Sequence, residues 1–375
     1  MSDRSPRLND RQRLNWLRLI RTPNVGPASF RDLINRFGSA EAALEALPEL
    51  AIAGGAGRIA RIPSTEEAEA ELAAAHKAGA RFIGIGEPDY PPLLKRMDNP
   101  PPLLAVRGEA AVFSLPPVAV VGARNASLAG VKMARMLATE LGRQGYGVVS
   151  GLARGIDTAA HEGSLATGTV AVLAGGLDQP YPPENIRLLD EIVERGAAVS
   201  EMPFGWEPRA QDFPRRNRII AGLSFGLVVV EAAKRSGSLI SARLAGEMGR
   251  LVFAVPGSPL DPRAAGANGL LKDGAILVTE ASDIIEAVMP LTGGAIELPQ
   301  KLDEPPDFNA TPPPRDSDRD RLIEALGPTP VGIDELIRHT GLHPAQVFMI
   351  LLELDLAGRL ERHSGGSVSL LLGDL

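Results

Sequence analysis

The sequence predicts an α/β protein with a doubly wound, mostly parallel sheet, flanked by a small helical domain and a winged-helix domain. Three observations predict this arrangement. Between residues 118 and 288, short β-branched runs alternate with helical stretches, which is typical of βαβ units. Most of these runs are apolar throughout, as expected of strands that helices cover on both faces. On either side of this region, apolar residues recur at helical spacing.

Composition limits the class of protein. The chain has 375 residues, enough for two to three domains of roughly 100–200 residues each. It has no cysteine, which excludes disulfides, thiolate metal sites and a cysteine nucleophile. The polar N-terminus and the lack of about 18 consecutive apolar residues predict a cytoplasmic protein without a membrane span. Because the net charge is −7, any nucleic-acid site must be a local concentration of arginine and lysine.

Residues 1–80 form the predicted N-terminal helical, SAM-like domain. Apolar residues between Leu14 and Leu47 follow helical spacing around a turn at Thr22–Pro27, a layout similar to a helix-hairpin-helix element. Backbone N–H groups in such a turn can bind phosphate, but this turn has no basic residue. We therefore favour a packing role over DNA contact. A further helix is expected at Thr65–Ala78.

Residues 81–289 form the predicted Rossmann-like domain with an N-terminal extension. The extension is proline-rich between residues 90 and 102, and runs of proline exclude regular helix and sheet there. Seven β-branched or apolar runs after it are the expected strands. They are Val118–Val121, Gly147–Ser150, Thr169–Ala174, Ala197–Ser200, Leu227–Glu231, Leu251–Val255 and Ala275–Thr279.

Residues 290–317 are expected to be an extended linker, because their proline-rich composition cannot bury a core. Residues 318–375 then show three helical stretches and an alternating tail, the layout of a winged helix. The third stretch, Pro344–Ala357, would be the recognition helix. It carries Glu353 and Asp355 but no basic residue, so it has nothing to neutralise phosphates. A protein-contact or dimer-supporting role is favoured over DNA binding.

The loops after the predicted strands carry the candidate site. Ligands of open α/β sheets bind at the carboxyl ends of the strands, and basic residues follow four of the first six strands here. Glycine-rich turns and helix N-termini at the same edge favour anions. The candidate DNA-binding residues are Arg124, Arg154, Phe213, Arg215, Asn217, Arg218, Lys234, Arg235, Ser236, Gly237 and Ser238, and the candidate phosphate-loop glycines are Gly122, Gly151, Gly155, Gly175 and Gly176.

The first loop argues against a dinucleotide. A G-x-G-x-x-G fingerprint would follow the first strand, but Arg124 stands where the second glycine would be. The chain also lacks the G-x-x-x-x-G-K-[ST] loop of nucleoside triphosphate sites. Several separated arginines match a run of phosphates better than one phosphate. We therefore expect single-stranded nucleic acid as the ligand and no cofactor.

The densest basic cluster contains three arginines, which must be divided between DNA contact and a structural role. Arg215, Arg216 and Arg218 cannot all face one way, so we assign Arg215 and Arg218 to DNA and Arg216 to a structural salt bridge. Phe213 precedes them and is the first candidate for stacking on a base, ahead of three other aromatic candidates. Asn217 could bond a phosphate or cap a helix. The three other aromatics are Tyr181, Phe204 and Trp206.

Other polar residues have open or structural interpretations. The segment Ser236–Ser238 begins a predicted helix and could cap it or bind phosphate; phosphate is favoured. Asp157 and His161 are one turn apart, but Asp157 is a natural first-turn residue, and a lone histidine makes no triad or metal site. Glu231 is expected to orient arginine or lysine side chains. No catalytic residue and no metal site is expected.

The same segments resemble the DprA/Smf (DNA processing) family from residue 90 to about residue 283. The motifs occur in the family's order. They are "YPPLL", "VAVVGAR", "VSGLARGIDTAAHEGSL", "AGGLDQPYPPEN", "SEMPFG", "FPRRNRIIAGLS", "VVVEAAKRSGSLISARLAGEMGR", "FAVPG" and "GANGLLKDGA".

The resemblance implies a single-stranded DNA-binding protein that protects incoming DNA and helps to load the RecA recombinase during natural transformation. It also implies a homodimer formed through the Rossmann-like domain. The alternative is a nucleotide-binding enzyme, because related Rossmann-like proteins cleave nucleoside monophosphates. Their Pro-Gly-Gly-x-Gly-Thr loop is absent here, where the corresponding segment reads "EAAKRSGSLISA".

Overall fold

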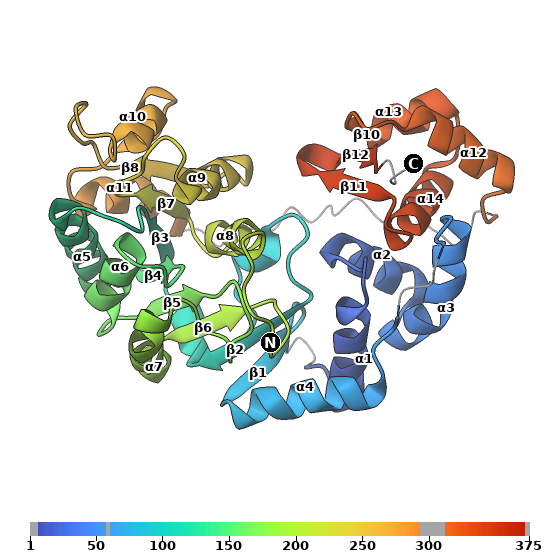
Figure 1. Cartoon of the computed structure of the whole chain (residues 1–375), viewed down its shortest axis with the longest axis horizontal. Coiled ribbons are helices and arrows are strands. Elements are labelled where there is room, and N and C mark those ends of the chain that lie inside the picture. Colours follow the sequence, from blue (N-terminus) through green and yellow to red (C-terminus); the bar gives the residue numbers. More distant parts are fainter. Residues whose placement is uncertain (1–6, 58–60, 293–311, 372–375) are drawn as a thin grey trace. The chain divides into compact units, whose positions relative to one another are not determined.

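The computed structural model describes residues 7–57, 61–292 and 312–371, which divide into two units (Figure 1). The sheet unit comprises residues 70–292 together with Arg7, and the flanking unit comprises the remaining described residues of both chain ends. Helix α4 (Thr65–Lys77) crosses the boundary between them. Within the described ranges, no helix has the length and apolar character needed to cross a membrane.

The sheet unit contains one sheet of nine strands in the order β1-β2-β6-β5-β4-β3-β7-β8-β9. All pairings from β6 to β9 are parallel, which confirms the predicted mostly parallel sheet. The strands are β1 (Ala80–Gly84), β2 (Leu103–Gly108), β3 (Pro117–Val121), β4 (Gly147–Ser150), β5 (Thr169–Val172), β6 (Ala197–Ser200), β7 (Gly226–Val229), β8 (Leu251–Ala254) and β9 (Ile276–Leu277).

Strands β1 and β2 form an antiparallel edge that the sequence analysis missed. Strand β2 begins immediately after the Pro100–Pro102 run and pairs antiparallel with β6. The prolines end where the ladder starts, so they do not remove any of its hydrogen bonds.

Helices cover both faces of the sheet (Figure 1). They are α5 (Leu128–Arg143), α6 (Ile156–Ser164), α7 (Ile186–Arg195), α8 (Asp212–Gly222), α9 (Gly237–Glu247), α10 (Ala265–Lys272) and α11 (Ala281–Thr292). Because side chains alternate along a strand, Val118 and Val120 of β3 enter one core with α5 and α6, whereas Ala119 and Val121 enter the other with α8 and α9. This two-sided burial explains why the strands are apolar throughout.

The flanking unit combines the N-terminal helices with a winged helix. The N-terminal helices are α1 (Asp10–Arg21), α2 (Pro27–Phe37) and α3 (Ala40–Ala53), and the winged helix contains α12 (Asp316–Ala325), α13 (Ile333–Thr340) and α14 (Pro344–Leu356). Its three-stranded antiparallel sheet has the order β10 (Val331–Gly332), β12 (Ser367–Leu370), β11 (Leu360–His363). One hydrophobic core contains residues of α1–α3 together with Leu352 and Leu356 of α14.

The linker expected at residues 290–317 is shorter than predicted, because helices occupy both of its ends. Helix α11 continues through Pro290 to Thr292, and α12 already begins at Asp316. Residues 293–311 of this segment lie outside the described residues.

Candidate nucleic-acid interface

The carboxyl ends of β3, β4 and β7 meet where the strand order reverses, and a pocket of about 480 Å³ opens there. A smaller pocket adjoins it and shares Arg124, Phe213 and Arg216. We call the two together the switch-point crevice. Seven of the predicted DNA-binding residues line the larger pocket, and Arg154 lines the smaller one. The seven are Arg124, Phe213, Asn217, Arg235, Ser236, Gly237 and Ser238.

An aromatic and cationic cluster lies between the two pockets. The ring of Phe213 is approached by Tyr181, with centroids 5.7 Å apart and an interplanar angle of 70°. The guanidinium carbon of Arg124 lies 4.9 Å from the Phe213 centroid, within the range of a cation–π contact. Arg124 and Tyr181 are exposed, while Phe213 is half-buried. The cluster therefore offers a ring face and a positive charge at one place.

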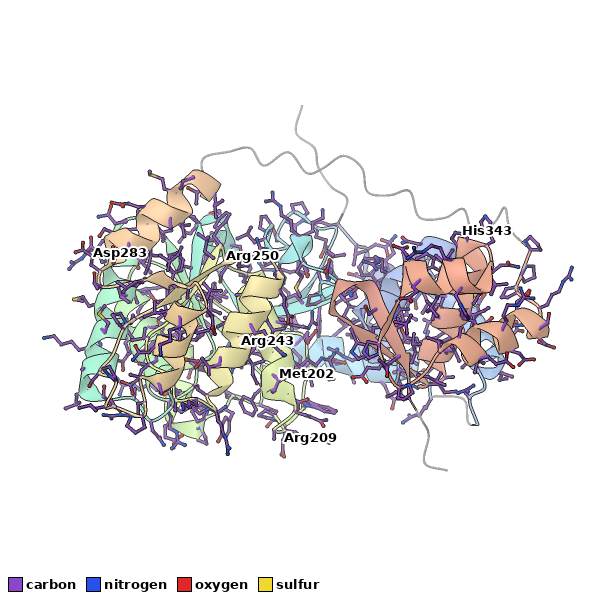
Figure 2. All side chains as sticks on the ribbon, turned by 90° about the horizontal axis from the view of Figure 1, so that it is seen from above. Met202, Arg209, Arg243, Arg250, Asp283 and His343 are labelled. Carbon is purple, nitrogen blue, oxygen red and sulfur yellow. The ribbon has the colours of Figure 1, made fainter. Side chains whose placement is uncertain are left out.

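The other candidate aromatics do not join this cluster. Trp206 donates its indole N–H to Asp212 at 2.9 Å, and Arg209 (labelled in Figure 2) stacks over it with a centroid distance of 4.6 Å. Phe204 packs against Phe82 with centroids 6.0 Å apart. Both rings therefore have structural partners outside the crevice.

Arg216 forms the floor of both pockets and is only 6% exposed. Its Nη1 donates to the carbonyl of Val172 at 3.0 Å, whereas its Nε has no hydrogen-bond partner within the described structure. Burial lowers the pKa of Arg216 to about 10, and the nearby charge of Asp157 partly opposes this shift. Arg216 thus stays cationic at neutral pH beneath the crevice.

Gly151 makes this position of Arg216 possible. A Cβ on Gly151 would stand 1.6 Å from Nη1 of Arg216, so only glycine lets the guanidinium lie against the backbone there. Asp157 accepts the N–H groups of Gly151 and Ala153 at 3.1 and 3.3 Å, which holds the loop in place. Burial raises the pKa of Asp157, and the charge of Arg216 opposes this.

The structure places the three arginines of α8 in two different surroundings. Arg215 donates to Glu201 at 3.0 Å, and Arg218 pairs with the same carboxylate and donates to the Asn99 carbonyl at 3.1 Å. Neither side chain lines the crevice. The residue that enters it is Arg216, which we had assigned to a salt bridge.

Helical geometry explains this division. Phe213, Arg216 and Asn217 are three and four positions apart and share the face of α8 that borders the crevice. Arg215 and Arg218 share a different face, which looks toward Glu201 at the end of β6. The start of α8 at Asp212 thus decides which arginines meet the crevice.

The N-terminus of α9 borders the opposite side of the crevice. The Ser236 hydroxyl caps the helix by accepting the N–H of Ser238 at 3.4 Å, and the two hydroxyl oxygens are 2.7 Å apart. Asn217 lies inside α8 rather than at its cap and donates to the Gly237 carbonyl at 3.4 Å. The positive end of the α9 dipole therefore faces the pocket.

The remaining predicted residues have varied places. Lys234 is exposed but does not line the crevice, and Arg154 lies 3.8 Å from Glu184 at the surface. Gly155 has φ +77° and begins the turn into α6. Of the predicted glycines, Gly122 and Gly151 line the crevice, and Gly155, Gly175 and Gly176 do not. Asn125 also lines the larger pocket and was not among the predicted residues, although it directly follows Arg124 in the first loop.

The side chain of Glu231, which follows β7, reaches the N-terminus of α5. A dinucleotide-binding sheet would hold a pyrophosphate at this position. The Glu231 carboxylate accepts the N–H of Ser127 at 3.1 Å and the Ser127 hydroxyl at 2.6 Å. A Cβ on Gly130 would come within 2.6 Å of it. The only arginine or lysine paired with it among the described residues is Arg263, at 3.9 Å, rather than the cations of the 232–235 loop. The protein's own carboxylate thus fills this anion position.

No acid–base pair is built around His161. This residue is fully buried, and its Nδ1 lies 2.7 Å from the Thr169 hydroxyl. Burial lowers the pKa of His161 to about 3, so the ring stays neutral at physiological pH. Glu162 pairs with Arg135 at the surface. Among the described residues, no group of His, Asp and Glu side chains is arranged to hold a metal ion.

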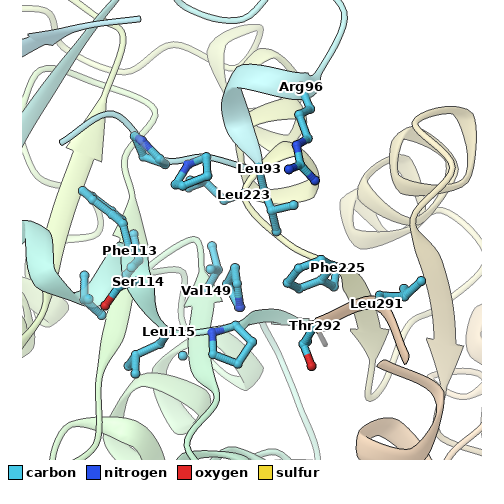
Figure 3. A pocket seen from close by; sticks show the side chains of 17 residues that line it. Leu93, Arg96, Phe113, Ser114, Leu115, Val149, Leu223, Phe225, Leu291 and Thr292 are labelled. Atoms are coloured by element: carbon cyan, nitrogen blue, oxygen red, sulfur yellow. The ribbon is translucent and has the colours of Figure 1, made fainter. Parts of the chain in front are cut away.

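A second large cavity lies at the opposite, amino-terminal edge of the strands (Figure 3). It has a volume of about 440 Å³ and a mainly apolar lining that includes Leu115, Phe225 and Leu291. Arg96 is the one basic residue among the described residues that line it. Of these two cavities, the switch-point crevice is the one lined by several cations, namely Arg124, Arg154, Arg216 and Arg235.

Three family models match the chain. The model described as DNA recombination-mediator protein A matches residues 81–289. A DprA-like N-terminal HHH domain matches residues 10–74, and a DprA winged helix domain matches residues 305–366.

Named relatives agree with these matches. Protein Smf of Escherichia coli is 41% identical over 286 residues, which cover 75% of each chain. DNA processing protein DprA of Bacillus subtilis is 42% identical over 218 residues, covering 57% of this chain and 73% of that protein.

Two solved structures are also similar. DprA of Streptococcus pneumoniae has a TM-score of 0.60 and 34% identity, covering 72% of this chain and 97% of that one. DprA of Helicobacter pylori, described for its single-stranded DNA binding mode, has a TM-score of 0.52 and 28% identity, covering 56% of this chain and 96% of that one.

Proposed function

This chain belongs to the DNA recombination-mediator protein A (DprA) family, and we propose that it binds single-stranded DNA in the switch-point crevice. The observation that carries the proposal is that exposed cations and an accessible aromatic ring line the same crevice. Arg124 and Arg235 supply charge for phosphates, and Phe213 with Tyr181 supplies a stacking surface. The Helicobacter pylori relative, described as binding single-stranded DNA, supports this ligand.

The geometry favours a single strand over a duplex. Phe213 is half-buried between the two pockets, so a base must leave its stack to lie against the ring. Bases of a single strand do so at low cost, while duplex bases must first unpair. The buried charge of Arg216 beneath the ring adds attraction for a phosphate that enters with the base.

We also propose that the chain works as a recombination mediator in the cytoplasm. It would protect incoming DNA, form a homodimer through the sheet unit and pass the strand to the RecA recombinase. The matched family description supports this role, because a mediator must hold a strand and then release it to a recombinase.

We propose binding without catalysis. The alternative enzyme would use a glutamate after a late strand to cleave nucleoside monophosphates, but the Glu231 carboxylate is bound to Ser127 at the start of α5. Incubation with nucleoside monophosphates should release no free base. Base release at enzymatic rates, lost in Glu231→Gln, would establish the alternative.

Salt dependence of single-strand binding tests the site. Each phosphate contact contributes about −0.7 to the slope of log K against log salt for a single strand. Arg124→Ala should therefore weaken binding and make the slope shallower by about 0.7. Arg187→Ala is the matched control, because Arg187 is an exposed arginine of the same unit that lines neither pocket of the crevice. An Arg124→Ala slope equal to that of wild type would rule out this phosphate contact.

A further inference from the structure

The flanking unit contains two elements that resemble DNA-binding motifs. One is the hairpin turn Thr22–Pro27, whose backbone N–H groups could face a phosphate. The other is α14, the third helix of the winged helix, which occupies the place of a recognition helix. For either element to bind DNA, its outer face must be free.

Helix α14 is buried on both of its faces. Val347, Ile350 and Leu354 face the core of the winged helix itself. On the other face, Leu352 and Leu356 are each 2% exposed and belong to the core formed by α1–α3. The face that a recognition helix would present to a groove is therefore apolar and packed against α2 and α3, the helices that lie beside α14 in Figure 1.

The hairpin turn lies against the end of the same helix. Asn24, at φ +66°, donates its side-chain amide to the Leu356 carbonyl at 3.2 Å. Ser29, in the first turn of α2, donates its hydroxyl to Asp355 at 2.8 Å. A Cβ on Gly54 would stand 1.9 Å from the Glu353 carbonyl oxygen, so the backbones of the two parts touch. The fit is close at three separate places.

We call the contact of α14 with the hairpin turn, α2 and α3 the seam. The charged side chains at the seam are paired within the flanking unit. Arg362 donates to Asp355 at 2.9 Å and to Asp32 of α2 at 3.2 Å, which joins the winged helix to the N-terminal helices. Glu353 is 2% exposed and accepts two hydrogen bonds from Arg319, both 2.8 Å long. The acidic residues of α14 thus have internal cationic partners and do not face solvent as a repulsive surface.

We propose that the hairpin turn and α14 are permanent partners, and that the flanking unit is a closed module that does not bind DNA. The groove-facing side of α14 is covered by the core of α1–α3, and the hairpin turn, in which Pro23 and Asn24 are exposed, is tied to the end of α14 through Asn24. DNA binding by the chain is then confined to the sheet unit. The contacts between the hairpin turn, α3 and α14 do not depend on whether the switch-point crevice binds DNA.

A pair of cysteines across the seam tests whether the hairpin turn and α14 stay together permanently. The chain has no cysteine, so Ser29→Cys with Asp355→Cys places two thiols where a 2.8 Å hydrogen bond now joins the side chains. Oxidation of the full-length protein should cross-link nearly all molecules within one chain. Affinity for single-stranded and duplex oligonucleotides should agree within twofold between the oxidised and reduced forms. Each single variant is the control for thiol effects.

Three results would overturn the proposal. The first is a reduced form that binds duplex at least tenfold more tightly than the oxidised form, because the seam would then open to DNA. The second is cross-linking between two chains, because the partner would then be another copy. The third is failure to cross-link both on oxidation and with a short bis-maleimide, although the double variant folds as wild type does.

Charge placed on the covered face provides an independent test. Leu352→Arg should lower the melting temperature of the full-length protein by at least about 4 °C, because it buries a charge in a closed core. Ile52→Arg is the matched control, since Ile52 is a 57% exposed residue of α3 in the same unit. Single-strand affinity should stay within twofold of wild type in both. A Leu352→Arg protein that keeps its stability and gains duplex affinity would show that the face is free.

Loss of single-strand affinity separates the two proposals. If Leu352→Arg loses tenfold or more while Arg124→Ala has no effect, the strand is bound by the flanking unit, and both the closed module and the crevice fail. If neither variant changes affinity, only the crevice fails.

Discussion

Helix N-termini and glycine-containing turns occur in both units of this protein, with opposite results. In the sheet unit, α9 begins beside an open pocket lined by Arg124 and Arg235. In the flanking unit, the turn before α2 packs against α14, and Asn24 bonds to the end of that helix. A turn or helix N-terminus that resembles a phosphate-binding motif is thus defined by its neighbours as much as by its own backbone.

The two units also differ in how they use arginine. On α8, Arg215 and Arg218 are paired with Glu201, and Arg216 remains under the crevice with an unbonded Nε within the described structure. In the flanking unit, Arg319 and Arg362 both bind acidic residues at or near the seam. Arginine therefore holds one unit together, and in the other it is divided between structure and the crevice.

The largest expected effect is on the buried pair of the flanking unit. Arg319→Met leaves the Glu353 carboxylate buried without its partner and should lower the free energy of unfolding by about 3–5 kcal/mol. Chemical denaturation measures this. Arg319→Met combined with Glu353→Leu should recover most of the loss, and single-strand affinity should stay unchanged in both. A loss of affinity in the folded variants would break the division of roles between the units.

A smaller effect is expected at the ring of the crevice. Phe213→Ala should weaken single-strand binding by about 1–3 kcal/mol, because one base loses its stacking surface. The salt slope should not change, which distinguishes this residue from Arg124. Phe113→Ala is the matched control, since Phe113 is also half-buried but lines the apolar cavity at the opposite edge. Equal losses in both variants would mean that the effect comes from the fold.

Lowering the pH should reduce the stability of the sheet unit by a moderate amount, through a buried histidine that the flanking unit lacks among its described residues. Of the five histidines, all in described segments, only His161 is buried, and it lies in the sheet unit. Its pKa falls from 6.5 to about 3 on folding, so the unfolded state binds the proton more readily. Stability is therefore complete above pH 6.5 and falls by about 1.4 kcal/mol for each pH unit below it.

Denaturation of wild type and of His161→Leu between pH 8 and pH 5 tests this dependence. The curve of the variant should be flatter than that of wild type. The raised pKa of Asp157 has the opposite sign and is present in both proteins, so it cancels in the difference. Parallel curves would show that His161 is not the group responsible.

The central fold was predictable because its signal is local. Strands β4 and β6 begin and end at the predicted residues, and β3 begins one residue earlier than predicted. Continuous apolar runs mark such strands because both faces are covered. Strands β1 and β2 were missed because the proline-rich run between them hides their pairing, which joins residues such as Phe82 and Ala105.

The site was predictable only in part, for a geometric reason. The loops could be assigned to one sheet edge from their order along the chain, and this brings Arg124, Phe213 and Arg235 together. The face of α8 that meets the crevice depends on how that helix packs against the sheet and α9. Spacing alone shows that Arg215 and Arg216 diverge, but not which of them turns inward.

The seam of the flanking unit was the least predictable feature. Its contacts join residues that are more than 300 positions apart, such as Asn24 and Leu356. One local signal was present. Apart from Gln346, Glu353 and Asp355, helix α14 is apolar on both of its faces, and a helix that is hydrophobic all round is buried rather than presented to a groove.

The seam has a consequence for synthesis on the ribosome. The residues that complete the core around α3 lie near the other end of the chain, and 305 positions separate Gly54 from Arg359, which bonds to it. At about 5–20 residues per second, roughly 15–60 s pass before the second part is made. During this time, α1–α3 lack Leu352 and Leu356, and the apolar surface that these leucines will cover is exposed. Helices α1–α3 are therefore translated well before α14, which completes their core, and this makes them a natural target of a chaperone in the nascent chain.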